Sequence, residues 1–95
     1  MYVRVTTYQA DPARLEDLKA KLPPIKAKLE EMDGIVDWYA AWRADGQGVV
    51  FTVFDSKAAA DASLDEVRGI WTSLAGLLKA TPKADTFDTV ETLDD

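Results

Sequence analysis

Three tryptophans are the side chains of this sequence that best suit the binding of a small aromatic molecule. Trp38 and Trp42 stand four positions apart with Ala40 midway between them, and Trp71 follows later in the chain. In a strand, alternate residues point to one face, so a small side chain between two indole rings leaves either a slot for a helix side chain or a cavity. Trp71 could close such a cavity from a facing helix. The alternative, in which the three indoles pack together as ordinary core, stays open.

The sequence of 95 residues contains no His, no Cys and no Asn. Thiol catalysis, His-based triads, haem ligation by His, disulfides and zinc sites of the usual kind are therefore excluded. The catalytic candidates that remain are Asp61, Arg68 and Tyr39, whose side chains can accept a proton, hold a charge or donate a hydrogen bond. We expect a site without a metal ion or a cofactor.

The charge and length of the chain limit its partners. The formal net charge is −6, from 17 acidic and 11 basic residues, and the basic residues are scattered, which argues against a nucleic-acid partner. No apolar run approaches the roughly 20 residues that cross a bilayer, and the first residues alternate unlike a signal peptide, so we expect a cytoplasmic protein. A single domain over residues 1–95 buries a modest share of its surface, which favours pairing with a second copy.

Alternation of apolar and polar residues predicts four strands, over residues 2–9, 35–44, 48–54 and 87–93. A first helix is predicted to begin at Pro12, after the N-cap residue Asp11, and to end at residues 33–34. Two adjacent prolines inside this helix predict a kink or break near residues 21–22.

A second helix is predicted from the N-cap residue Ser56 to Thr81, and a capping box at Ser63 predicts that it restarts there at a different angle. The order of elements is therefore β-α-β-β-α-β. Because β-α-β crossovers are right-handed, this order predicts a ferredoxin-like α+β fold, in which a four-stranded antiparallel sheet carries both helices on one face and leaves the other face bare.

We expect the more apolar row of each strand to face the helices, which selects Val3, Val5, Val49, Phe51 and Val53. A hairpin loop of even length would then point Trp38, Ala40 and Trp42 at the helices as well, whereas an odd loop would exchange Trp38 and Tyr39. The ligand-binding residues predicted from this arrangement are Trp38, Trp42, Trp71, Ser63 and Phe51.

The bare face of the predicted sheet is too apolar to remain in water. We predict that it is an interface with a second sheet, formed by Arg4, Tyr8, Tyr39, Thr52 and Phe54.

Residues 34–43 and 50–60 resemble the antibiotic-biosynthesis-monooxygenase-like (ABM) proteins of the dimeric α+β barrel superfamily. In those proteins a Gly-led aromatic strand, a hairpin and a second strand run into an Ala-rich helix. The second strand ends in an aromatic residue, an acidic residue and a serine, which here are Phe54, Asp55 and Ser56. The element order matches over nearly the whole chain.

The resemblance implies a homodimer whose two sheets stack face to face into a barrel, with a pocket between the sheet and helices of each subunit. Some such proteins oxidise polycyclic phenols with molecular oxygen and no metal or cofactor, and others degrade haem. The family often places a His where this chain has Ser63, and the quinone-forming members use an Asn with a Trp and an Arg. Without His or Asn, Trp71 and Arg68 are the nearest remnant of those sets.

Two functions follow as hypotheses. One is cofactor-independent oxygenation of a small aromatic or polycyclic phenolic compound, because a bound phenolate can itself reduce oxygen in a dry pocket that handles the proton. The alternative is a non-catalytic homodimer that binds a small hydrophobic molecule or serves in assembly, which the missing His and Asn favour.

Overall fold

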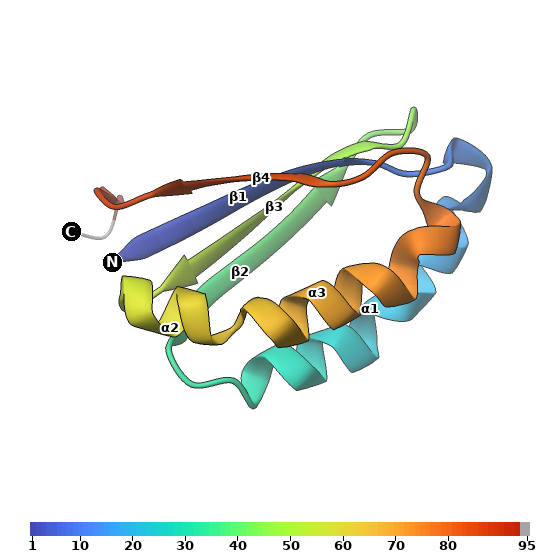
Figure 1. Ribbon diagram of the computed structural model, residues 1–95. Coiled ribbons are helices and arrows are strands. Elements are labelled where there is room, and N and C mark those ends of the chain that lie inside the picture. The colour runs from blue at the N-terminus through green and yellow to red at the C-terminus, as the bar shows by residue number, and fades with distance from the viewer. Residues whose placement is uncertain (94–95) are drawn as a thin grey trace.

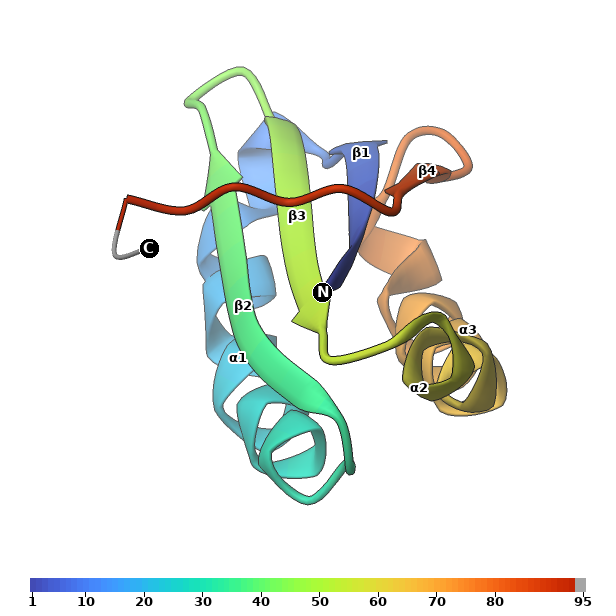
Figure 2. The ribbon, with the colours of Figure 1, turned by 90° about the vertical axis from the view of Figure 1, so that its left-hand side faces the viewer.

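The strands of this chain form one antiparallel sheet, and its helices all lie on one face of that sheet (Figure 1). The computed structural model describes residues 1–93. The strand order is β2-β3-β1-β4, from left to right in Figure 2, where the strands are β1 (Tyr2–Gln9), β2 (Ile35–Trp42), β3 (Gln47–Phe54) and β4 (Lys83–Phe87). The helices are α1 (Leu15–Glu30), α2 (Lys57–Ala62) and α3 (Leu64–Leu74), with the short 3-10 turns η1 (Pro12–Arg14) and η2 (Ala75–Leu77). The predicted ferredoxin-like α+β class is confirmed.

The last strand is the one whose position the sequence pattern missed. We predicted a strand over residues 87–93, but β4 ends at Phe87. In the structure Thr7 pairs with Lys83 and Val3 pairs with Phe87, so β4 fills the open edge of β1. Backbone pairing along an available edge outweighs the low strand propensity of lysine, alanine and aspartate there.

Helix α1 runs without interruption through two prolines. Asp11 caps the 3-10 turn η1, because its carboxylate accepts the backbone N–H of Ala13 at 3.0 Å, and α1 itself follows from Leu15 and ends at Glu30, earlier than predicted. Of the predicted kink or break before Pro23 and Pro24, the break is wrong, since both prolines lie inside one continuous helix. Both are exposed, and buried leucine and isoleucine side chains on either side hold the two halves of the helix against the same core.

The second helical segment is interrupted at Ser63 and restarts at Leu64, as predicted, but not through a capping box. Ser56 caps α2 by accepting the N–H of Ala59 at 3.1 Å. Ser63 does not cap α3, because its hydroxyl donates to the Ala60 carbonyl at 2.7 Å. The helix also ends earlier than Thr81, at Leu74 and the following 3-10 turn.

The faces expected for β1 and β3 are reversed in the structure. Four residues predicted for the bare face are buried under the helices instead, namely Arg4 (7% exposed), Tyr8 (5%), Thr52 (8%) and Phe54 (0%). The valines and Phe51 that we expected under the helices lie on the opposite face, where Phe51 is 42% exposed. The more apolar row is therefore the uncovered one. The sheet therefore carries apolar side chains on both faces, one beneath the helices and one uncovered.

Strand β2 points Trp38, Ala40 and Trp42 toward the helices, as expected, although the route to that result differs. Trp42 pairs with Gly48, which leaves an odd number of loop residues, whereas an even loop was expected. Because β3 also turns the opposite face to the helices from the one we expected, the two differences cancel, and the tryptophans of β2 still face the helices. A β-bulge at Val36 inserts one extra residue into β2, so that Ile35 and Trp38 point to the same face of the sheet.

Gly46 holds the hairpin in this register. Its φ is +89°, and a Cβ atom there would clash with the Ala10 carbonyl oxygen. The N–H of Gly46 donates to the Arg43 carbonyl at 2.9 Å, and its carbonyl accepts the N–H of Ala10 at 2.8 Å. The loop is thus fixed to the end of β1 by a residue that needs to be glycine.

Replacing Gly46 is expected to destabilise the protein. Gly46→Ala should lower the free energy of unfolding by about 2 kcal/mol or more, because a positive φ is unfavourable for residues with a Cβ atom and the clash adds to it. The matched control is Gly69→Ala in α3, where a Cβ atom meets nothing within 4 Å. Alanine should raise the stability there by about 1 kcal/mol. Urea unfolding followed by circular dichroism measures both, and an unchanged Gly46→Ala variant would contradict this role of the loop.

Candidate functional site

An apolar hollow lies between the sheet, α1 and α3, and we call it the slot. Its volume is about 50 Å³. Trp38, Trp42 and Trp71 all line it together with Ala40. The other lining residues are Tyr8, Leu18, Leu22, Ile25, Leu29, Val50, Val67, Ile70 and Leu74.

The slot exists because small residues stand between large ones on the sheet. Ala40 pairs with Val50, and the tryptophans on either side of Ala40 rise above that row. Gly48, the partner of Trp42, also pairs with Tyr8 on the other side. A Cβ atom at Gly48 would clash with the Tyr8 ring, so the ring lies across the glycine.

Tyr8 forms the polar end of an otherwise apolar lining. Its ring centroid lies 5.6 Å from that of Trp71, with the two planes tilted by 52°. Its hydroxyl donates to the backbone carbonyl of Ala41 at 3.4 Å. Burial raises the pKa of Tyr8, so its hydroxyl stays protonated at neutral pH and acts as a hydrogen-bond donor.

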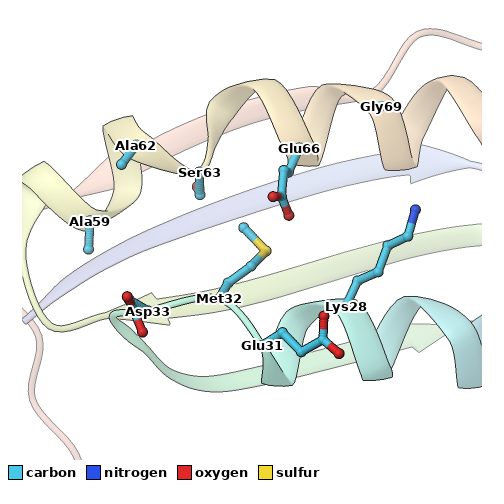
Figure 3. A pocket seen from close by; sticks show the side chains of 9 residues that line it. All are labelled: Lys28, Glu31, Met32, Asp33, Ala59, Ala62, Ser63, Glu66 and Gly69. Carbon is cyan, nitrogen blue, oxygen red and sulfur yellow. The ribbon is translucent and has the colours of Figure 1, made fainter.

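A larger and more polar cleft adjoins the slot along the same two helices (Figure 3). Leu29 and Ile70 line the slot, whereas the neighbouring Lys28 and Gly69 line the cleft. The cleft has a volume of about 710 Å³. Figure 3 shows Lys28 extending from α1 toward α3, and shows the remaining lining residues Glu31, Met32, Asp33, Ala59, Ala62, Ser63 and Glu66.

Arg4 on β1 connects the sheet to the carboxyl end of α2, close to Ser63 of this cleft. Its guanidinium donates to the Ala60 carbonyl at 2.9 Å and to the Ser63 hydroxyl at 3.5 Å, and it lies 5.1 Å from the centre of the Phe54 ring. Desolvation lowers the pKa of Arg4, with the charge of Asp61 opposing that shift. A cation at the carboxyl end of a helix satisfies carbonyls that the helix leaves free. The predicted ligand residue Ser63 therefore has a structural partner and also lines the cleft.

The three catalytic candidates from the sequence are not brought together at the slot. Asp61 pairs with Lys57 at 3.1 Å on the exposed side of α2. Arg68 pairs with Asp65 at 3.6 Å on the exposed side of α3. Tyr39 lies on the bare face of the sheet, 59% exposed.

Tyr39 and Phe51 are cross-strand neighbours on that bare face. The predicted placement of Phe51 beside the tryptophans is therefore wrong, because its strand turns the opposite face to the helices. Tyr8 is the slot residue that sequence reasoning assigned elsewhere. The signal for it was Gly48, since a glycine inside a strand often marks the close approach of another group.

The described part of the chain offers no evident metal centre. No group of three or more Asp and Glu side chains within residues 1–93 is arranged to hold a metal ion. In the same residues, no helix is long and apolar enough to span a membrane.

Comparison with known proteins gives structural neighbours only. No family model and no curated protein matches the chain. A protein of unknown function from Nitrosomonas europaea, NE2512, superposes with a TM-score of 0.81 at 18% identity, over 96% of this chain and 90% of that one. A Deinococcus radiodurans protein provisionally named an antibiotic biosynthesis monooxygenase gives a TM-score of 0.80 at 18% identity, over 98% and 96% of the two chains.

A third neighbour has a named activity. It is an asparagine-to-alanine variant of SnoaB, a cofactor-independent oxygenase from Streptomyces nogalater, with a TM-score of 0.77 at 18% identity over 99% of this chain and 97% of that one. Agreement over whole chains at such low identity establishes the fold. This chain has the fold of the antibiotic-biosynthesis-monooxygenase-like proteins, as its sequence resemblance predicted.

Proposed function

We propose that this protein takes up a small aromatic molecule in the slot between its sheet and its helices. The observation that carries the proposal is the lining of the slot, in which three indoles and one phenol surround a hollow with no charged side chain. Aromatic rings gain from stacking and edge-to-face contacts beyond the burial of their area. A packed core without function has little reason to leave an unfilled space beside its largest side chains.

The slot must widen to admit a ring. Its volume of about 50 Å³ exceeds the roughly 30 Å³ share of one water molecule, but it is well below the roughly 150 Å³ of a cavity that binds benzene. Two of the lining residues, Leu22 and Ile25, flank Pro23 and Pro24. Because prolines donate no N–H, this turn of α1 has fewer backbone bonds than the rest of the helix, and we propose that the wall widens here.

A larger side chain in the slot should weaken the binding of an aromatic ligand. Ala40→Leu places a larger side chain between the tryptophans and is expected to weaken the binding of naphthol by about tenfold or more, measured by titration calorimetry. Ala27→Leu, the same change at an exposed position of α1, should leave binding unchanged. Thermal unfolding verifies that both variants fold. Equal affinities of the two variants and the wild type would place the ligand elsewhere.

We further propose an oxygenase activity for the same site, which the fold shared with SnoaB favours. A phenol and one molecule of oxygen give a quinone and one molecule of water. One oxygen atom enters the ring, the other leaves as water, and the substrate supplies the electrons. The slot would contribute exclusion of water and a protonated donor at Tyr8. Asp61, Arg68 and Tyr39 take no part in this proposal, because their side chains lie outside the slot.

Oxygen consumption tests the chemical step separately from binding. Protein treated with a chelator, without added cofactor, should consume one molecule of oxygen for each quinone formed from naphthol. Oxygen uptake is measured with an electrode and quinone formation by absorbance. If the protein binds naphthol but consumes no oxygen, the proposed oxygenase activity is wrong and the proposed ligand binding stands.

The bare face of the sheet supports a proposed homodimer. Its centre is apolar, with Tyr39, Phe51 and Val5 in one cross-strand row. Charged residues such as Asp37 and Lys83 lie on the outer strands. An apolar centre with a polar rim is typical of protein interfaces, and stacking on a second copy would bury the apolar row. The interface residues first expected, apart from Tyr39, are buried inside the subunit.

A charge at the centre of this face should prevent dimerisation. Phe51→Asp is expected to give a monomer at micromolar concentration by light scattering, because an unpaired carboxylate would be desolvated in the interface. Leu64→Asp is the control, since Leu64 is 41% exposed, close to the 42% of Phe51, but lies on a helix. A wild-type monomer, or a dimeric Phe51→Asp variant, would remove the sheet-to-sheet dimer.

A further inference from the structure

The Tyr8 hydroxyl is held in the wall of the slot with a poor hydrogen bond. Tyr8 is 5% exposed, and its bond to the Ala41 carbonyl is 3.4 Å long. Hydroxyl donors in proteins usually lie 2.7–2.8 Å from their acceptors, and interactions near 3.6 Å no longer count as bonds. Elsewhere in this structure the hydroxyls of Tyr39 and Ser63 reach acceptors at 2.7 Å. The buried Tyr8 donor is therefore only weakly satisfied.

Neighbouring residues fix where this hydroxyl lies. The ring crosses Gly48 from β1 toward β2 and contacts Trp71. Ala41, whose carbonyl receives the bond, stands between Ala40 and Trp42, which both line the slot. The donor is thus placed at the β2 wall of the slot, beside two of the residues that would contact a bound ring.

We propose that the Tyr8 hydroxyl determines which aromatic molecules the slot prefers, by donating a hydrogen bond to a ligand oxygen in exchange for the long bond to Ala41. This inference rests on the proposed uptake of an aromatic molecule. The preferred ligands are phenols and quinones, which carry an acceptor oxygen on the ring. A hydrocarbon of the same shape leaves the buried hydroxyl with its weak bond and gains contact with apolar side chains only.

Electrostatics at this position support the role of donor. Within residues 1–93, no other titratable side chain lines the slot. Burial raises the pKa of Tyr8 and keeps its side chain protonated. Tyr8 therefore presents a neutral O–H that donates to a ligand oxygen, whereas an ionised Tyr8 would repel that oxygen. A neutral donor serves a phenolate particularly well, since hydrogen bonds to charged acceptors are stronger than those between neutral groups.

A pair of variants and a pair of ligands test this role. The ligands are naphthol and methylnaphthalene, which differ by a hydroxyl in place of a methyl group. Tyr8→Phe should weaken naphthol binding by about threefold to tenfold and leave methylnaphthalene within about twofold, since a net hydrogen bond of this kind changes affinity by that factor. Tyr39→Phe makes the same chemical change on the opposite face and should alter neither affinity. Calorimetry measures the affinities of the wild type and both variants for the two ligands, and thermal unfolding verifies the fold.

The outcomes separate this inference from the proposed function. If Tyr8→Phe weakens both ligands equally, or neither, then Tyr8 acts through shape alone and the inference is overturned, while uptake in the slot stands. If wild-type protein binds neither ligand, the proposed uptake fails and the inference fails with it.

Discussion

The register between β2 and β3 determines which layer of the molecule each aromatic side chain of the hairpin joins. Residues 44–46 form the loop beyond the bond between Arg43 and Gln47, and the bulge at Val36 adds one residue to β2. Because side chains alternate along a strand, a slip of one residue would exchange Trp38 with Tyr39 and remove two walls of the slot. The positive φ of Gly46 and its bonds to the end of β1 therefore protect the candidate site as well as the fold.

The order of elements could be read from the sequence because all of them except β4 have a local signal at the right place. Alternation of apolar and polar residues located β1. Asp11 and Ser56 marked the beginnings of η1 and α2, where each side chain accepts a backbone N–H of the first turn. Local signals cannot report which face of a strand meets the helices. That choice depends on what covers the other face, and here the valine-rich face is the uncovered one. The rule that the more apolar row faces the helices assumes a single buried layer.

The same limit explains which parts of the candidate site could be predicted. Trp38, Ala40 and Trp42 share a face by spacing alone, so their grouping survives any choice of face. Tyr8 joins them through a cross-strand relationship with Gly48, which depends on register and on the covered face together. Asp61 and Arg68 were catalytic candidates by residue type, because a sequence does not show which side chains face away from a pocket. In the structure each is exposed and forms an ion pair with a neighbour on its own helix.

The residues that create the slot also make the subunit less stable than it could be. Ala40 leaves space between two indoles, Gly48 contributes no side chain to the sheet, and Pro23 and Pro24 remove backbone donors from α1. An unfilled volume of about 50 Å³ lowers stability by about 1 kcal/mol, and prolines inside a helix lower it by about 3 kcal/mol, a large share of what a small domain possesses. Burial of the bare face against a second copy would offset that loss without closing the slot, since the two lie on opposite sides of the sheet.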